Sequence, residues 1–182
     1  EIMEKNGNIE DRTNCCVFSI DPHGCQDFDD AFGFIETAEG YMVSIYIADV
    51  IVWIEHLELW ESFTERVSTI YFPDKKRPML PSILSDKLCS LQEGQRRFAF
   101  AMDIHIKKDE IIKIEYSKVL INVHKNFEYE EPDLLKDSNY GSLLSLTREL
   151  AGNYKYLYSL ADSHDVVAFY MIMMNHQVSK TM

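Results

Sequence analysis

Four aspartates crowd together near the beginning of the sequence, in the stretch IDPHGCQDFDDA: Asp21, Asp27, Asp29 and Asp30. Like charges at this spacing repel one another unless a cation neutralises them, and the chain already has a formal net charge of -12. A solvated acidic loop is the plainest interpretation, but apolar stretches flank the run at 17–20 and 31–35. Pro22 and Gly24 can also bend the chain, so that Asp21 returns towards the other three aspartates. The pattern therefore favours carboxylates that converge on one point.

Convergent carboxylate oxygens are hard ligands that suit Mg²⁺ or, in its place, Mn²⁺. A magnesium ion held by a few carboxylates and a substrate phosphate supports phosphoryl transfer or phosphodiester hydrolysis, and a further carboxylate can orient the nucleophile. We therefore expect a magnesium site with phosphate chemistry at residues 21–30. The residues alone leave nucleases and phosphatases open.

Three other kinds of site fit the cluster less well. An EF-hand loop starting at Asp27 would need Gly at its sixth position, where the chain has Phe32. The haloacid-dehalogenase type of phosphatase carries D-x-D-x-T/V, and here Ala31 stands at the last of these positions. A zinc site is disfavoured because the six histidines are scattered and only His23 lies in the cluster.

The composition is that of a globular domain with one core: 182 residues, 46% hydrophobic and 26% charged. The first residues lack the basic and apolar segments of a signal peptide, and no apolar run is long enough to span a bilayer. Four cysteines without CxxC spacing favour a reducing compartment. We therefore expect an intracellular protein without a membrane partner, cytoplasmic or, in a eukaryote, nuclear. The 30 acidic against 18 basic residues argue weakly against a nucleic-acid-binding surface.

Strand patterns surround the cluster. Residues 15–20 predict a short buried strand that ends at Asp21, and residues 30–36 and 41–50 predict a hairpin with Gly40 in its turn. The clearest alternation of apolar and polar residues covers 98–106, and after a turn at 107–110 a strand returns over 111–121. These segments predict a mostly antiparallel sheet.

The middle of the chain has a different period. Apolar residues at 60, 63, 67 and 70 have helical spacing, and three prolines in 71–81 predict a loop. Residues 82–91 predict a short helix with Ser82 as its N-cap.

After Asn126 the pattern becomes helical. One apolar stripe runs over 143–161 and a second over 166–178. Strands followed by helices indicate the α+β class, here a twisted, mostly antiparallel sheet followed by helices.

The stretch IDPHGCQDFDDA resembles the first motif of the ribonuclease II family, whose RNB domain has the pattern I-D-x-x-x-x-x-D-x-D-D-A. All four aspartates match in place. The resemblance continues in YIADV at 46–50, in PMLPSILSDKLCSL at 78–91 and in MIMMNHQVSK at 171–180. We therefore interpret residues 1–182 as a partial RNB catalytic domain, without its C-terminal part and without the cold-shock and S1 domains of the family.

The resemblance implies a hydrolytic 3′-to-5′ exoribonuclease that acts on single-stranded RNA with Mg²⁺ and releases nucleoside 5′-monophosphates. Carried onto this chain, it implies that Asp21, Asp27 and Asp30 are metal ligands. Asp29 would be the catalytic carboxylate that orients the attacking water or a metal.

Two aromatic positions also resemble the family's RNA-binding residues. Tyr71 matches a tyrosine that stacks against RNA, and Tyr129 matches one near the 3′-terminal base. Stacking suits an enzyme that accepts any sequence, because every base has a π-face. Either ring could instead be a packing residue. The resemblance further implies single-stranded RNA as a partner and a larger RNA-decay assembly around the protein.

The chain also departs from the family. A late motif with an arginine at the scissile phosphate lies beyond the sequence, and Ala168 and Phe169 stand where the family commonly has glutamates. These departures leave a second interpretation open, a non-catalytic RNA-binding or assembly module. A third, a metal-dependent phosphatase, would act on small phosphate esters without a preference for RNA.

Overall fold

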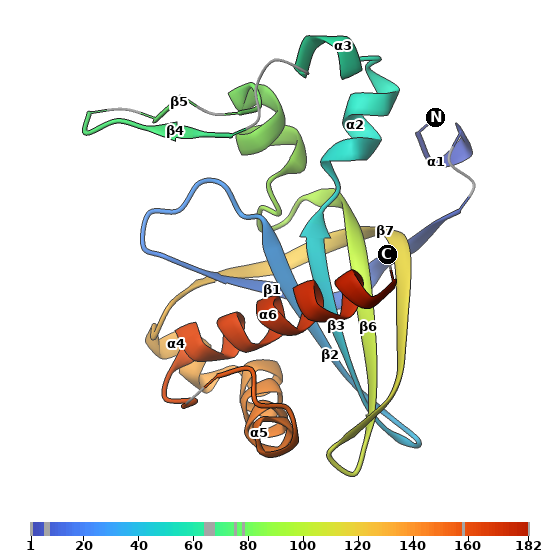
Figure 1. Cartoon of the computed structure of the whole chain (residues 1–182), viewed down its shortest axis with the longest axis vertical. Coiled ribbons are helices and arrows are strands. Elements are labelled where there is room, and N and C mark those ends of the chain that lie inside the picture. Colours follow the sequence, from blue (N-terminus) through green and yellow to red (C-terminus); the bar gives the residue numbers. More distant parts are fainter. Residues whose placement is uncertain are drawn as a thin grey trace.

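The computed structural model describes residues 2–5, 8–63, 68–74, 76–77, 79–157 and 159–181. Five strands form a closed barrel in the order β1-β2-β3-β6-β7 (Figure 1). Their bounds are β1 Ile9–Asp21, β2 Asp30–Thr37, β3 Gly40–Ala48, β6 Arg96–Lys107 and β7 Glu110–Glu128. The pairs β1–β2, β2–β3, β3–β6 and β6–β7 are antiparallel. The parallel pair of β7 with β1 closes the barrel. The predicted α+β class and mostly antiparallel sheet are confirmed.

Helices and short strands cover two regions of the barrel (Figure 1). At the end where β1 finishes and β2 begins, the chain forms α2 (Val50–His56), α3 (Trp60–Phe63), the strand pair β4 (Ile70–Tyr71) and β5 (Lys76–Arg77), and the π-helix η1 (Ile83–Cys89). The C-terminal part forms α4 (Pro132–Lys136), α5 (Ser138–Asn153) and α6 (Ser163–Thr181), and α6 crosses the outside of the barrel (Figure 1). A further short helix, α1 (Ile2–Lys5), precedes β1.

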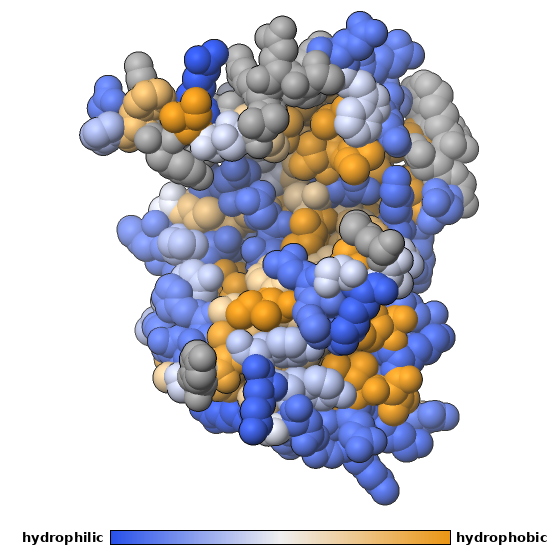
Figure 2. All heavy atoms as spheres, viewed as in Figure 1, coloured by the Kyte–Doolittle hydropathy of each residue, from blue (hydrophilic) through white to orange (hydrophobic). Residues whose placement is uncertain are grey.

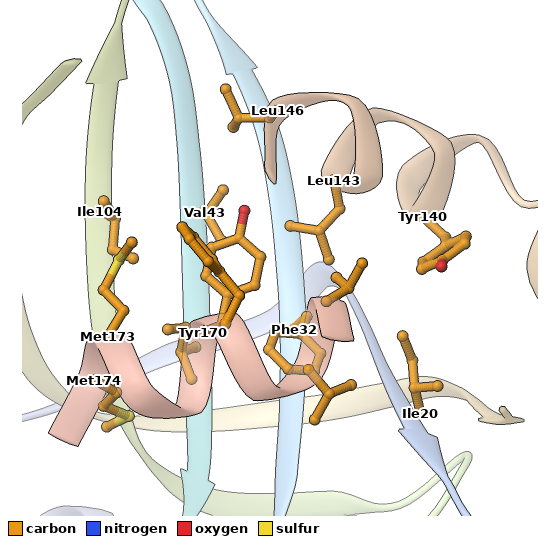
Figure 3. Packing of buried hydrophobic residues seen from close by; sticks show 14 of the residues in the cluster. Ile20, Phe32, Val43, Ile104, Tyr140, Leu143, Leu146, Tyr170, Met173 and Met174 are labelled. Atoms are coloured by element: carbon orange, nitrogen blue, oxygen red, sulfur yellow. The ribbon is translucent and has the colours of Figure 1, made fainter. Parts of the chain in front are cut away.

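The strands separate two apolar cores, because successive side chains of a strand point to opposite faces. On β3, Val43 and Ile45 join the core that α5 and α6 cover, where Tyr170 packs against Phe32 with ring centroids 5.9 Å apart (Figure 3). Tyr46 points the other way and joins a second core inside the barrel. Both faces of the sheet are therefore buried along much of its length.

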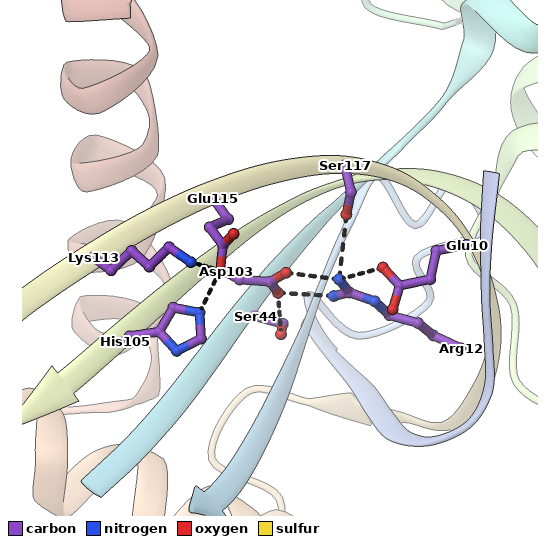
Figure 4. Close-up of polar contacts among 8 residues, drawn as sticks. All are labelled: Glu10, Arg12, Ser44, Asp103, His105, Lys113, Glu115 and Ser117. Carbon is purple, nitrogen blue, oxygen red and sulfur yellow. Dashed lines mark hydrogen bonds and ion pairs between the residues drawn. The ribbon is translucent and has the colours of Figure 1, made fainter. Parts of the chain in front are cut away.

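A buried ion pair crosses the interior of the barrel (Figure 4). Arg12 on β1 donates hydrogen bonds of 2.8 and 2.7 Å to the two carboxylate oxygens of Asp103 on β6, and Ser44 on β3 donates one of 2.6 Å. The side chains of Arg12 and Asp103 are only 12% and 6% exposed. These bonds connect three strands, about midway along β3 and β6, where Ser44 pairs with Asp103.

The outer surface in Figure 2 is mainly hydrophilic, with hydrophobic side chains gathered around α2 and along the C-terminal helices. Exposed apolar residues on the first of these regions are Ile51, Leu57, Trp60 and Ile83. Within the described ranges, no helix combines the length and the apolar character needed to cross a membrane.

Several predicted boundaries were wrong. The first strand starts at Ile9, well before residue 15, and the hairpin strand stops at Ala48. Asp49 then caps α2, accepting a hydrogen bond of 3.2 Å from the backbone N–H of Val52. Apolar residues continue beyond Asp49, so their periodicity did not mark the change from strand to helix. The capping aspartate sets this boundary.

The helix expected over 60–70 is also wrong at its end, because Ile70 lies in β4. Residues 64–67, including the expected position 67, lie outside the described part of the chain. Ser82 does precede a helix, but that helix is a π-helix and the Ser82 side chain makes no capping bond. The apolar stripe expected over 143–161 is helical only as far as Asn153, where α5 ends. Tyr154 and Leu157 pack against the core from the segment that follows, and Ala161 is exposed.

Candidate active site

The acidic loop, residues 21–30, joins β1 to β2 at one end of the barrel. Asp21 is the last residue of β1 and Asp30 is the first residue of β2. The Pro22–Gly24 bend that the sequence predicts is present, since the N–H of Cys25 donates a 3.0 Å hydrogen bond to the carbonyl of Pro22 and Gly24 has a φ of 74°. The turn therefore helps the chain to reverse between β1 and β2, which are neighbouring strands.

Ser90 and Leu91, far away in sequence, fasten the second half of this loop. The N–H of Phe28 donates to Ser90 Oγ (3.0 Å), and the N–H of Leu91 donates to the carbonyl of Phe28 (2.8 Å). Ser90 Oγ also donates to the carbonyl of Gln26 (3.2 Å). At the end of the loop, the N–H of Ala48 donates to the carbonyl of Asp29 (2.9 Å). Ser90 and Leu91, directly after η1, thus hold the second half of the acidic loop in place.

The carboxyl groups of Asp21 and Asp30 are held in an environment that disfavours their charge. Burial raises the pKa of Asp21 to about 6, and the charge of Asp29 adds to the effect. Burial, together with the charges of Asp21 and Asp29, raises the pKa of Asp30 to about 7. Asp21 Oδ2 and Asp30 Oδ2 are buried and accept no hydrogen bond from the described residues. Unsatisfied buried carboxylate oxygens are costly, and a cation would relieve that cost.

The four aspartates do not form a closed ligand set. Asp27 is half-buried and Asp29 is exposed. In the described ranges, no three His, Cys, Asp or Glu side chains come together closely enough to hold a metal ion. Carboxylates repel one another when no cation lies between them. The chemistry of the donors at Asp21 and Asp30 nevertheless fits a hard divalent ion.

Tyr129 lies beside this acidic pair, immediately after β7. Its N–H donates a 3.0 Å hydrogen bond to the carbonyl of Asp21. Burial raises the pKa of the Tyr129 phenol to about 12, and the charges of Asp30 and Asp21 contribute. The ring stacks on that of His164 on α6, with centroids 3.6 Å apart and an interplanar angle of 11°. Sequence reasoning missed His164, because nothing local distinguishes an exposed histidine at a helix start.

The other predicted positions are less closely tied to the loop. Tyr71 lies on β4, where its backbone pairs with Lys76, but its side chain is outside the described part of the structure. Its role in RNA binding stays a prediction. Phe169, which stands at a position where the ribonuclease II pattern commonly has glutamate, is buried against Tyr170 and Tyr156 and serves packing.

Comparisons with known proteins agree with these observations. Residues 9–163 match the family model described as RNB domain. The chain is 36% identical over 134 residues to exosome complex exonuclease RRP44 of Mus musculus, an alignment covering 72% of this chain and 14% of that protein. It is 32% identical over 124 residues to exoribonuclease 2 of Aeromonas hydrophila, covering 66% of this chain and 18% of that protein. The chain thus spans less than a fifth of the length of either relative.

Solved structures share the fold. RNase R of Mycoplasma genitalium, in complex with ribose methylated single-stranded RNA, superposes with a TM-score of 0.62 at 21% identity, covering 94% of this chain and 24% of that one. Yeast Ssd1, described as a pseudonuclease, superposes with a TM-score of 0.68 at 17% identity, covering 82% of this chain and 20% of that one.

Proposed function

This chain belongs to the RNB domain family, and from that premise we propose that its acidic loop hydrolyses single-stranded RNA from the 3′ end with a bound Mg²⁺ or Mn²⁺ ion. One observation carries the proposal: Asp21 and Asp30 each hold a buried carboxylate oxygen that no described residue satisfies. Asp21, Asp27 and Asp30 would hold the ion. When bound, the ion supplies positive charge and Lewis acidity at the scissile phosphate.

The remaining residues of the site have distinct roles in this proposal. Asp29 is exposed beside the buried pair and orients the attacking water by accepting a hydrogen bond from it. The water oxygen loses a proton and bonds to phosphorus, the bond from phosphorus to the 3′ oxygen of the preceding nucleotide breaks, and that oxygen takes up a proton to become a 3′ hydroxyl. The terminal nucleotide therefore leaves as a nucleoside 5′-monophosphate. Tyr71 stacks against a base, which tolerates any sequence, and Tyr129 lies near the 3′-terminal base.

The comparisons support the substrate and the setting. Two relatives are named as exonucleases, and one of them is named as part of an exosome complex. A structure with the same fold holds single-stranded RNA. We infer that the protein acts within an RNA-decay assembly.

The test is degradation of a single-stranded RNA oligomer labelled at its 5′ end, with Mg²⁺, by the parent chain and by the Asp29→Asn variant. We expect progressive shortening to a small labelled product with the parent, nucleoside 5′-monophosphates in solution, and no turnover with the variant. Asn keeps the shape of Asp29 but removes the charge, so RNA binding should remain. Equal degradation by both proteins would refute the role of Asp29, and release of internal fragments would refute attack from the end.

A second candidate, a non-catalytic RNA-binding module, is favoured by one comparison, the fold shared with a pseudonuclease. The buried packing position of Phe169 is consistent with it. This candidate predicts that the parent chain binds the oligomer, shows no turnover with Mg²⁺ or Mn²⁺, and binds equally well after Asp29→Asn.

A further inference from the structure

The stacked pair Tyr129 and His164 has the geometry of two consecutive bases. The two rings are nearly parallel, and their 3.6 Å centroid distance is close to the roughly 3.4 Å spacing of nucleotides along a stacked strand. His164 is exposed although Tyr129 covers one face of its ring, so the opposite face can be reached by a third ring. Tyr129 is the inner member, next to Asp21, and His164 is the outer one.

A reciprocal pair of hydrogen bonds fixes this stack in place. The N–H of Ser163 donates to Glu130 Oε1 (2.7 Å), and the N–H of Glu130 donates to Ser163 Oγ (3.2 Å). Ser163 is fully buried. Because these two residues directly adjoin His164 and Tyr129 in sequence, the bonds clamp the start of α6 onto the end of β7. The two rings are thus ordered before any ligand arrives, which lowers the entropy cost of binding to them.

The surroundings of the stack exclude one kind of RNA contact. A helix N-terminus commonly attracts phosphate, but here one carboxylate directly precedes α6 and another lies in its first turn. Asp162 accepts from the N–H of Asp165 (3.1 Å), and Asp165 accepts from the N–H of Ala161 (2.7 Å). Negative charge at this point repels phosphate, whereas the face of an aromatic base carries no such charge. The ring of His164 is therefore suited to a base and not to the backbone.

We propose that His164 is a base-stacking residue: Tyr129 and His164 form a two-ring platform, and a base of the RNA strand whose end lies at the acidic loop stacks on the outer face of His164. This inference rests on the proposed function, since it needs RNA at that loop. It assigns His164 to binding and leaves the chemical step to the aspartates.

The experiment uses single-stranded RNA oligomers with 2-aminopurine placed singly at each of the last few 3′ positions, because stacking quenches the fluorescence of this base. Binding is measured in the Asp29→Asn background, so that no strand is shortened, with fluorescence anisotropy of a 5′ dye as an independent measure of affinity. His164→Ala is compared with His164→Phe, which restores a flat ring. The matched control is His176→Ala, an exposed histidine at the far end of α6 that contacts Tyr156.

The expected result is quenching at one 3′ position that His164→Ala abolishes and His164→Phe restores, with affinity reduced roughly five- to tenfold by the alanine variant alone. His176→Ala should match the parent. If RNA binds but His164→Ala leaves both quenching and affinity unchanged, His164 is not a stacking residue, while the proposed function stands. Stronger quenching after His164→Ala would mean that His164 merely covers Tyr129, and would also overturn the inference. Absence of any RNA binding by the parent chain would overturn the inference together with the proposed function.

Discussion

Asp21 ends β1 and Asp30 begins β2, and each contributes to the acidic loop one buried carboxylate oxygen that no described residue satisfies. The two strands are neighbours in the barrel, so the folding of the sheet itself places these two groups together. Burial raises the pKa values of both carboxyl groups, so their ionisation destabilises the folded barrel. Such an arrangement is typical of functional sites.

The raised pKa values predict an unusual dependence of stability on pH. Asp21 and Asp30 have folded-state pKa values of about 6 and about 7, against an ordinary value of 3.8. Between pH 3.8 and about 7, the folded state therefore holds protons that the unfolded state has lost, and stability falls as pH rises through this window. Thermal unfolding in a chelator should show a lower midpoint at pH 8 than at pH 5.

The control for this pH effect is the double variant Asp21→Asn and Asp30→Asn. In this variant the unfolding midpoint should fall much less between pH 5 and pH 8 than in the parent, because the introduced amides do not titrate. A variant whose unfolding midpoint changes with pH as steeply as that of the parent would contradict the assignment of the effect to these two residues.

A divalent cation should reverse this trend. Binding to the folded state alone raises the unfolding midpoint, and ligation needs deprotonated carboxylates, so Mg²⁺ or Mn²⁺ should stabilise the chain more at pH 8 than at pH 5. Asp30→Asn should remove most of the increase. Glu149→Gln, which removes one exposed charge on α5, should retain it. Equal losses in the two variants would indicate a general charge effect instead of a site.

Breaking the ion pair inside the barrel should be costly. Arg12→Met leaves the carboxylate of Asp103 buried without its guanidinium partner, and we expect a loss of about 3–5 kcal/mol in the free energy of unfolding by urea denaturation. The double variant Arg12→Met and Asp103→Leu should recover much of this loss, since it buries no charge. Lys113→Met, which breaks an exposed pair with Glu115, should change little. A double variant no more stable than Arg12→Met would show that the charge left behind is not the cause.

Two glycines should differ in their response to alanine. At Gly40, at the start of β3, an added Cβ would overlap the backbone carbonyl of Ile106 on β6, which cannot move without breaking the β3–β6 pairing. At Gly24 the φ is positive, but nothing lies within 4 Å. We expect Gly40→Ala to cost at least about 2 kcal/mol and Gly24→Ala about 1 kcal/mol, measured by urea denaturation. The reverse order would contradict the steric argument.

Local patterns in the sequence determined a large part of this protein. Alternation predicted the strands, because the face on which a side chain lies depends only on its position along the strand. The spacing of apolar residues predicted the C-terminal helices. The run of aspartates, with Pro22 and Gly24, predicted the acidic loop. The pattern failed where one element gives way to the next, as at Asp49 and at Ile70, because capping and pairing with distant strands decide those boundaries.

Only the tertiary structure decided which residues meet. The parallel pairing of β1 with β7 closes the barrel across about a hundred residues, and neither strand carries a signal for its partner. That closure brings Tyr129 to Asp21, and the packing of α6 brings His164 to Tyr129. The same closure decides that Asp21 is buried, Asp27 and Asp30 are half-buried and Asp29 is exposed. The sequence by itself determined the residue types that could do chemistry and the elements that carry them. Their burial, and hence their pKa values and their contacts, depends on long-range packing that no local pattern encodes.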